Sequence, residues 1–164
     1  MTDELLFKHV CSLSSKKISK IYKYLGQGIS REVYAINEDF VVKVAKGNEG
    51  IYQNRIEHHV YTHTDKDLLK YLCPIVWFQP DRLIMRRAIP FSKYNKNEFI
   101  HINSMRPEKE LSVDLKKLAS AFLLFYEDII SVSSWGVYKN ERVLIDYGCT
   151  EQIGDVFYRV FFNW

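Results

Sequence analysis

The sequence has few of the residues that mark disulfide-rich, fibrous or disordered chains. Its 164 residues include only 3 cysteines, 7 glycines and 4 prolines. The odd number of cysteines (Cys11, Cys73 and Cys149) and the absence of C-x-x-C spacing argue against a disulfide framework or a zinc site. With 47% hydrophobic and 15% aromatic residues, the chain has enough apolar material to form a core. We therefore expect a compact fold with reduced thiols.

The sequence also lacks long apolar runs and a strong net charge. An apolar stretch such as residues 118–126 is shorter than the roughly 20 residues that cross a bilayer. The acidic start, with Asp3 and Glu4, does not resemble a signal peptide. A net charge of +3 is too small to indicate nucleic-acid binding. We expect a cytoplasmic protein without a membrane or nucleic-acid partner, and the composition leaves its oligomeric state open.

The N-terminal half carries the signals of an antiparallel sheet. The first twenty residues predict a polar-faced helix or a loop, and alternating patterns then predict a three-stranded meander. Apolar residues at three-to-four spacing predict one helix, and two apolar runs around Pro80 predict a hairpin. The expected strands are 21–25, 32–36, 40–45, 75–78 and 83–85, and the expected helix is 49–64.

The C-terminal half is expected to be mostly helical. Residues 91–112 are polar and without a period, which is typical of a surface loop or a short helical connector. Ser112 is expected to cap a helix that runs to about Asp128, and residues 142–148 return to strand and turn. The aromatic tail, residues 155–164, is expected to cap this half, with a partner-binding or dimer patch as the alternative.

Two glycines, Gly26 and Gly28, lie two residues apart between predicted strands. Glycine lets backbone N–H groups come close to phosphate oxygens, which a Cβ atom would prevent. A dinucleotide-binding fingerprint would instead place a helix directly after the strand. Taken alone, the pair is more typical of an ordinary hairpin turn.

Lys43 stands in the middle of an apolar strand, where an unpaired ammonium group is costly. A phosphate held by the glycine turn would supply an anion, and Glu57 on the predicted helix would supply a second, orienting partner. The alternative is that Lys43 lies on the solvent face of an amphipathic strand.

Asp146 ends an apolar strand in the sequence Asp-Tyr-Gly, which can project a carboxylate toward Mg²⁺ bound to phosphates. The glycine turn, the strand lysine, the helix glutamate and this aspartate follow one another in the order used by the protein kinases. Residues 21–150 therefore resemble a compact protein-kinase-like domain, of the short kind found in bacteriophages and bacteria.

This resemblance implies an α+β fold with ATP and Mg²⁺ as cofactors. It implies a single kinase-like domain, with a five-stranded antiparallel sheet and one helix in residues 1–88 and a truncated, mostly helical lobe in residues 89–164. By the same resemblance, Lys43 would bind the α- and β-phosphates and pair with Glu57, and Asp146 would bind the metal. The positions expected to contact ATP are Gly26, Gly28, Ser30, Val33, Lys43, Met85 (the gatekeeper position) and Ala88.

The sequence departs from the kinase pattern at several positions. Arg31 stands where the third glycine usually lies, and only 16 residues follow Gly148. Counting back about eighteen residues from the metal aspartate gives Asp128 as the catalytic base, but the metal-binding asparagine is then replaced by Ser133. Aligning the chain on Trp135-Gly136 instead puts Ile129 in the aspartate place and Ser134 in the asparagine place.

Two functions remain open from the sequence. The first is an ATP- and Mg²⁺-dependent phosphotransferase that acts on Ser/Thr hydroxyls, with Asp128, Lys43 and Glu57 as catalytic residues. The second is a catalytically degenerate kinase-like module that binds nucleotide and acts by binding or inhibiting a partner protein. The first implies a protein substrate and the second a protein partner.

Overall fold

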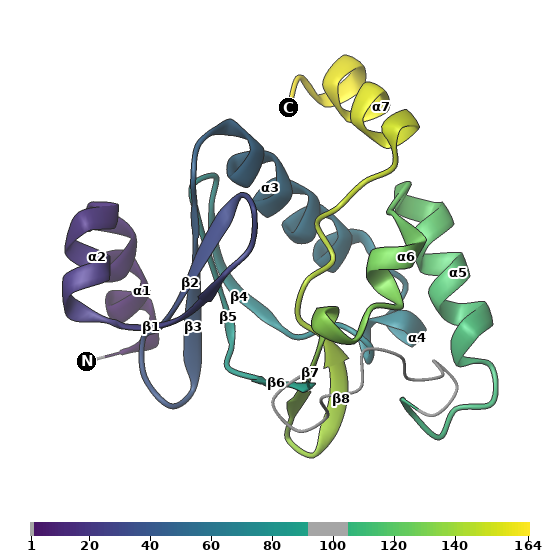
Figure 1. Ribbon diagram of the computed structural model, residues 1–164, viewed down its shortest axis with the longest axis horizontal. Coiled ribbons are helices and arrows are strands. Elements are labelled where there is room, and N and C mark those ends of the chain that lie inside the picture. Colours follow the sequence, from purple (N-terminus) through teal and green to yellow (C-terminus); the bar gives the residue numbers. More distant parts are fainter. Residues whose placement is uncertain (1, 92–104) are drawn as a thin grey trace. The chain divides into compact units, whose positions relative to one another are not determined.

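The computed structural model describes residues 2–91 and 105–164 (Figure 1). The chain divides into two compact units, which are described separately. The first comprises Met1–His58 and Pro74–Arg87, and the second comprises His59–Cys73 and Ala88–Trp164. The α+β fold class expected from the sequence is confirmed.

The first unit is built on a five-stranded antiparallel sheet, as predicted. Its spatial order is β1-β2-β3-β5-β4, so that β3 is the central strand. The strands are β1 (Lys23–Gln27), β2 (Arg31–Ala35), β3 (Phe40–Ala45), β4 (Ile75–Gln79) and β5 (Arg82–Arg86). Helix α3 (Asn48–His63) follows β3, and its residues up to His58 belong to this unit.

Two further helices, α1 (Asp3–Ser12) and α2 (Ser15–Ile21), precede the sheet. The sequence left a polar-faced helix or a loop open for the first twenty residues, and the structure has two helices there. Their few apolar side chains nevertheless pack on the sheet. The Phe7 and Phe40 rings, for example, pack edge-on, with their ring centroids 4.8 Å apart. Arg82 on β5 also donates to the Leu13 carbonyl oxygen at 3.3 Å and to Ser15 Oγ at 3.0 Å.

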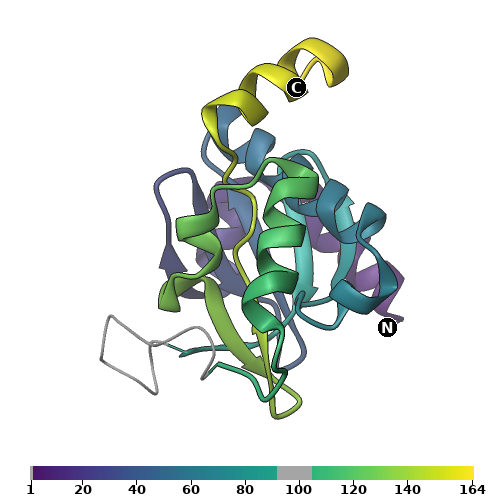
Figure 2. The same ribbon diagram turned by 90° about the vertical axis from the view of Figure 1, so that its right-hand side faces the viewer.

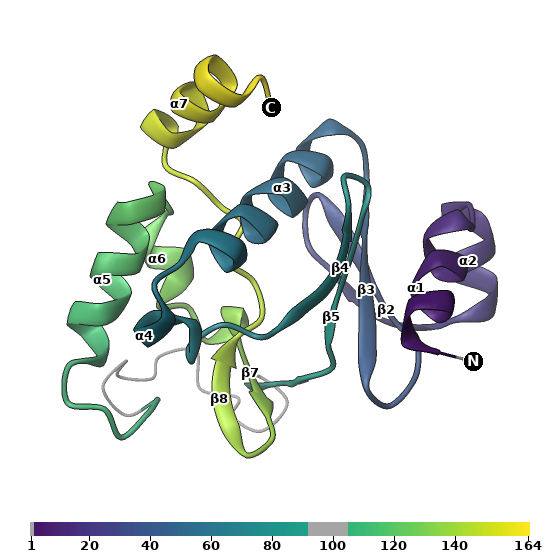
Figure 3. The same cartoon turned by 180° about the vertical axis from the view of Figure 1, so that it is seen from behind.

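Both faces of the central strand are therefore covered. Phe40, Val42 and Val44 pack in one apolar cluster with Phe7, Val10 and Ile18 of α1 and α2. Successive side chains of a strand point to opposite faces, so Lys43 lies on the other face. Figures 1 and 3 show α1 and α2 on one side of the strands and α3 on the other.

The second unit combines helices with a small sheet of order β6-β7-β8. Its strands are β6 (Ile89–Pro90), β7 (Trp135–Tyr138) and β8 (Glu141–Leu144). Its helices are α4 (Lys66–Leu69), α5 (Leu111–Phe122), α6 (Tyr126–Ile129), the short 3-10 turn Val132–Ser134 and α7 (Gln152–Phe162).

Several predicted boundaries in this unit were wrong. Ser112 lies in the first turn of α5 and does not cap it, because the helix begins at Leu111 after Glu110. The predicted helix to Asp128 is broken at Leu123, whose φ of 54° is left-handed and ends α5. Strand β8 ends at Leu144, two residues before Asp146. The predicted polar connector falls mostly on residues 92–104, outside the described residues.

The aromatic tail forms α7, which is drawn in yellow in Figure 2 and is hydrogen-bonded to the last residue of α5. Tyr158 is buried, and its hydroxyl donates to the Phe122 carbonyl oxygen at 3.0 Å. Val160 and Phe161 on the same helix are exposed. The tail therefore covers α5 with one face, and a partner-binding role of its exposed face stays a prediction.

Among the described residues, no helix is long and apolar enough to span a membrane.

Candidate functional site

The glycine turn joins β1 to β2 at one edge of the sheet. The Gly28 N–H donates to the Arg31 carbonyl oxygen at 2.9 Å and closes the turn. A Cβ atom added at Gly26 or at Gly28 would meet no heavy atom within 4 Å. Gly26 has a positive φ beside a shift in the β1–β2 register, and packing among the described residues does not explain Gly28; a role of either glycine in holding ATP stays a prediction.

Lys43 of β3 and Glu57 of α3 form a buried ion pair. Lys43 Nζ lies 2.8 Å from Glu57 Oε1 and 2.9 Å from Glu57 Oε2. Lys43 is 5% exposed and Glu57 is fully buried. The predicted pairing is therefore found, and the alternative that Lys43 lies on a solvent face is wrong, because α3 covers that face of β3. Their roles toward a nucleotide stay predictions.

Arg31 adds a second cation to the same carboxylate. Its Nη2 lies 2.9 Å from Glu57 Oε1, and its Nη1 donates to Asn54 Oδ1 at 3.2 Å. The sequence interpretation treated Arg31 only as a replaced glycine and missed this contact. Arg31 and Val33 lie two residues apart on β2 and share a face, and Val33 lies opposite Lys43, but this register is not given by the sequence alone.

Ser30 and Gly50 bring the glycine turn against α3. The buried Ser30 hydroxyl donates to Gln53 Oε1 at 2.6 Å. A Cβ atom on Gly50 would lie 2.3 Å from the Ser30 carbonyl oxygen and 2.8 Å from Ala45 Cα. Gly50, which the sequence interpretation did not single out, is therefore the residue that permits α3 to approach the sheet. A role of Ser30 in holding ATP stays a prediction.

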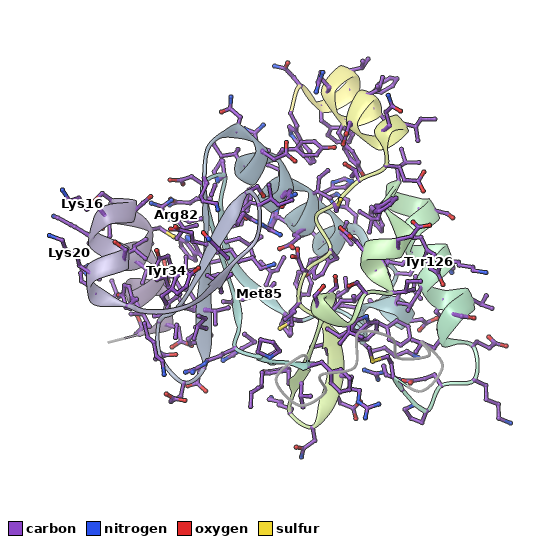
Figure 4. All side chains as sticks on the ribbon, viewed as in Figure 1. Lys16, Lys20, Tyr34, Arg82, Met85 and Tyr126 are labelled. Atoms are coloured by element: carbon purple, nitrogen blue, oxygen red, sulfur yellow. The ribbon has the colours of Figure 1, made fainter. Side chains whose placement is uncertain are left out.

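Met85 and Ala88 lie at and beyond the end of β5. Met85 is buried on β5, where it pairs with Val41 on one side and with Ile75 on the other (Figure 4). Ala88 is half-buried. It is the first residue of the segment Ala88–Trp164, which belongs to the second unit. The gatekeeper position and the adenine contact stay predictions for these residues.

Asp146 and Asp128 are both exposed carboxylates of the second unit. Asp146 follows β8, and its N–H donates to the Ser134 carbonyl oxygen at 3.3 Å. Asp128 lies on the short helix α6. Ile129, which takes the aspartate place in the alternative alignment, is buried, and its carbonyl oxygen accepts from Trp135 Nε1 at 2.8 Å. Of the two alignments, only the one with Asp128 offers an accessible base.

Cys149 lies close to both carboxylates. Burial raises the pKa of its thiol to about 12, with further contributions from a hydrogen bond to Asp128 and from the negative charges of Asp128, Asp146 and Asp155. The fold of this unit thus gathers the candidate base and the candidate metal ligand around one thiol. The sequence interpretation assigned Cys149 no such position.

This arrangement predicts how Cys149 reacts. Because only the thiolate is alkylated, the rate with iodoacetamide should keep rising with pH toward about 12 and show no plateau near pH 9. Asp128→Asn removes a negative charge beside the thiol, which lowers its pKa and should speed alkylation several-fold at pH 9. Peptide mass spectrometry measures the rate at Cys149. The neighbouring change Glu127→Gln is the control, and equal rates in the two variants would contradict the placement.

The carboxylates of the second unit suit an Mg²⁺ ion that is held jointly by the protein and by the phosphates of a substrate. Among residues 2–91 and 105–164, no three His, Cys, Asp or Glu side chains form a group that could hold a metal ion by themselves. Mg²⁺ is commonly bound by one or two carboxylates together with substrate phosphates, and it keeps several waters. An exposed aspartate such as Asp146 fits that role.

Comparisons with known proteins give a distant similarity. No protein-family model matches the chain, and no curated protein matches it. One solved structure that matches is described as the ternary complex of streptomycin, ATP and APH(2")-IIa. It is 19% identical, with a TM-score of 0.44, over 90% of this chain and 71% of that chain. At this similarity, the functional assignment rests on the chain's own residues.

Proposed function

We propose that this protein is an ATP- and Mg²⁺-dependent phosphotransferase of the protein-kinase-like type, acting on Ser/Thr hydroxyls. The observation that carries the proposal is the buried Lys43–Glu57 pair, formed between the central strand of a five-stranded antiparallel sheet and the helix that follows it. The glycine turn on the same sheet supports it. This is the order and pairing that the kinase pattern requires.

The charges of this cluster suit a phosphate ligand. Lys43 and Arg31 carry two positive charges against the single negative charge of Glu57. All three side chains are buried, where charges interact more strongly than in water. Nucleotide phosphates would give these two cations further anionic partners, with additional hydrogen bonds from the backbone N–H groups of the glycine turn.

In the proposed reaction, each residue has one task. Lys43 would bind the α- and β-phosphates, Glu57 would orient Lys43, and Asp146 would hold Mg²⁺, which supplies charge neutralisation for the phosphates. Asp128 would accept the proton of the acceptor hydroxyl as its oxygen forms a bond to the γ-phosphorus. The bond from that phosphorus to the bridging oxygen then breaks, and ADP leaves with the electron pair.

The second candidate is a module that binds nucleotide without catalysis. The observation in its favour is the replacement of the metal-binding asparagine by serine in either alignment. Ser133 is exposed, with its hydroxyl 2.8 Å from the Ser131 hydroxyl, whereas Ser134 is buried. A serine hydroxyl is a weaker ligand for Mg²⁺ than a carboxylate or an amide oxygen, so turnover would be slow or absent.

The nucleotide site is tested by thermal stability with ATP and Mg²⁺. At an ATP concentration of 100 times Kd, binding should add about 2.7 kcal/mol to the free energy of unfolding and raise Tm. Lys43→Ala should abolish this increase while the protein still folds, because Glu57 keeps Arg31 as a partner. Lys23→Ala, at an exposed position on β1, is the matched control. A wild-type protein with no ATP-dependent increase in Tm would overturn both candidate functions.

Catalysis is then tested with γ-labelled ATP and peptides that contain serine and threonine. Asp128→Asn should keep the ATP-dependent rise in Tm and lose labelled product by a factor of about 10²–10⁴, the usual contribution of a general base. Glu127→Gln is the control. A rise in Tm without labelled product in the wild-type protein would reject the phosphotransferase and leave the binding module.

A further inference from the structure

Arg31 occupies a position from which it reaches the helix that carries Glu57. It is the first residue of β2 and is 4% exposed. In the register of β2 and β3 it lies opposite Ala45, two residues from Lys43. Residues two apart on a strand share a face, so Arg31 and Lys43 approach Glu57 from neighbouring strands of the same sheet face.

The contacts of Arg31 belong to a larger connection between the glycine turn and α3. Ser30 bonds Gln53, and Arg31 bonds both Asn54 and Glu57. Asn54 also donates to the Pro80 carbonyl oxygen in the β4–β5 turn at 3.1 Å. The helix is therefore tied to two turns of the sheet through side chains that lie on one of its faces.

The double pairing of Glu57 has a consequence when a nucleotide binds. Phosphates attract the Lys43 ammonium and weaken its bonds to Glu57. A buried carboxylate that loses its partner is strongly destabilised, and it avoids the penalty by taking up a proton. With Arg31 at 2.9 Å, Glu57 keeps a cation even while Lys43 shares its hydrogen bonds with the ligand.

We propose that Arg31 is a positioning residue that keeps Glu57 ionised and in place while Lys43 engages the nucleotide phosphates. The proposal rests on the proposed nucleotide site and concerns its assembly. The guanidinium group would then hold the glutamate in the position from which it pairs with Lys43. A glycine at this position, as in the kinase pattern, would remove the guanidinium group from Glu57.

The test compares Arg31→Met, which removes the charge, with Arg31→Lys, which keeps it. Isothermal titration with MgATP in two buffers of different ionisation enthalpy reports the protons taken up on binding. We expect Arg31→Met to bind ATP at least tenfold more weakly and to take up more protons per ATP than the wild-type protein at pH 7. Arg31→Lys should restore the wild-type proton count and most of the affinity.

The outcomes separate this inference from the proposed function. If the wild-type protein does not bind MgATP, the nucleotide site itself is rejected. If the wild-type protein binds and Arg31→Met binds equally well with the same proton count, the site stands and the role of Arg31 is overturned. Should Arg31→Met not fold, Arg31→Gln removes the charge while keeping a hydrogen-bonding group, and the same two quantities decide.

Discussion

Glu57→Gln should lower the free energy of unfolding by about 3–5 kcal/mol, the cost of breaking a buried ion pair by removing one partner. The effect should fall at the upper end of that range, because this single carboxylate is paired with two cations, Lys43 and Arg31. Glutamine keeps the shape of the side chain and can still accept hydrogen bonds, so the loss of stability measures the effect of removing the negative charge. Against a typical total stability of 5–15 kcal/mol, such a loss brings the protein close to unfolding.

Urea denaturation followed by circular dichroism measures this loss. The matched control is Glu49→Gln, which removes the same charge from an exposed position in the first turn of α3 and should change stability by less than about 1 kcal/mol. Equal losses in the two variants would show that the buried cluster contributes nothing beyond ordinary surface electrostatics. The slope with denaturant should stay constant in both variants if unfolding remains two-state.

Gly50→Ala is expected to be the second most damaging change. In an exposed helix this substitution would be favourable by up to about 1 kcal/mol. Here the added Cβ atom would lie 2.3 Å from a backbone oxygen and 2.8 Å from a backbone carbon, neither of which can rotate away. The helix must shift, and overpacking of this kind typically costs about 1–3 kcal/mol or more. The shift also moves Glu57, so ATP binding should be lost with the stability.

Gly28→Ala supplies the contrast for this prediction. It places the same methyl group where no heavy atom lies within 4 Å. Its thermal stability without ligand should stay within about 0.5 kcal/mol of the wild-type value. If the glycine turn admits phosphates, ATP binding should nevertheless weaken. Similar stability losses in Gly50→Ala and Gly28→Ala would contradict the close approach at Gly50.

The sheet and its lysine could be predicted from local patterns. Alternating apolar residues and turn signals located all five strands within about two residues, and β3 was placed at the observed residues. An ammonium group in an apolar strand needs an anion, which led to the pairing of Lys43 with Glu57. The strands depend on residues near one another in the sequence, and the ion pair depends on the high energetic cost of an unpaired buried ammonium group.

The missed features depend on contacts between distant segments. Arg31 and Glu57 are 26 residues apart, and nothing local indicates that they meet. Gly50 in a helix looks like a weak helix former until the opposing turn is known. The helix ends at Leu123 because this residue has a left-handed backbone conformation, which leucine seldom adopts. A prediction from apolar periodicity alone therefore extended the helix past Leu123. Packing, and not propensity, decides each of these cases.

The cover that α1 and α2 place on the sheet has a practical consequence for work with fragments. A fragment that begins at β1 retains the whole glycine turn, Lys43 and Glu57. It also exposes a row formed by Phe40, Val42 and Val44 on the central strand. A contiguous apolar patch of this kind promotes self-association in water. Expression vectors for the proposed nucleotide site should therefore retain the N-terminal helices, even though neither helix supplies a candidate site residue.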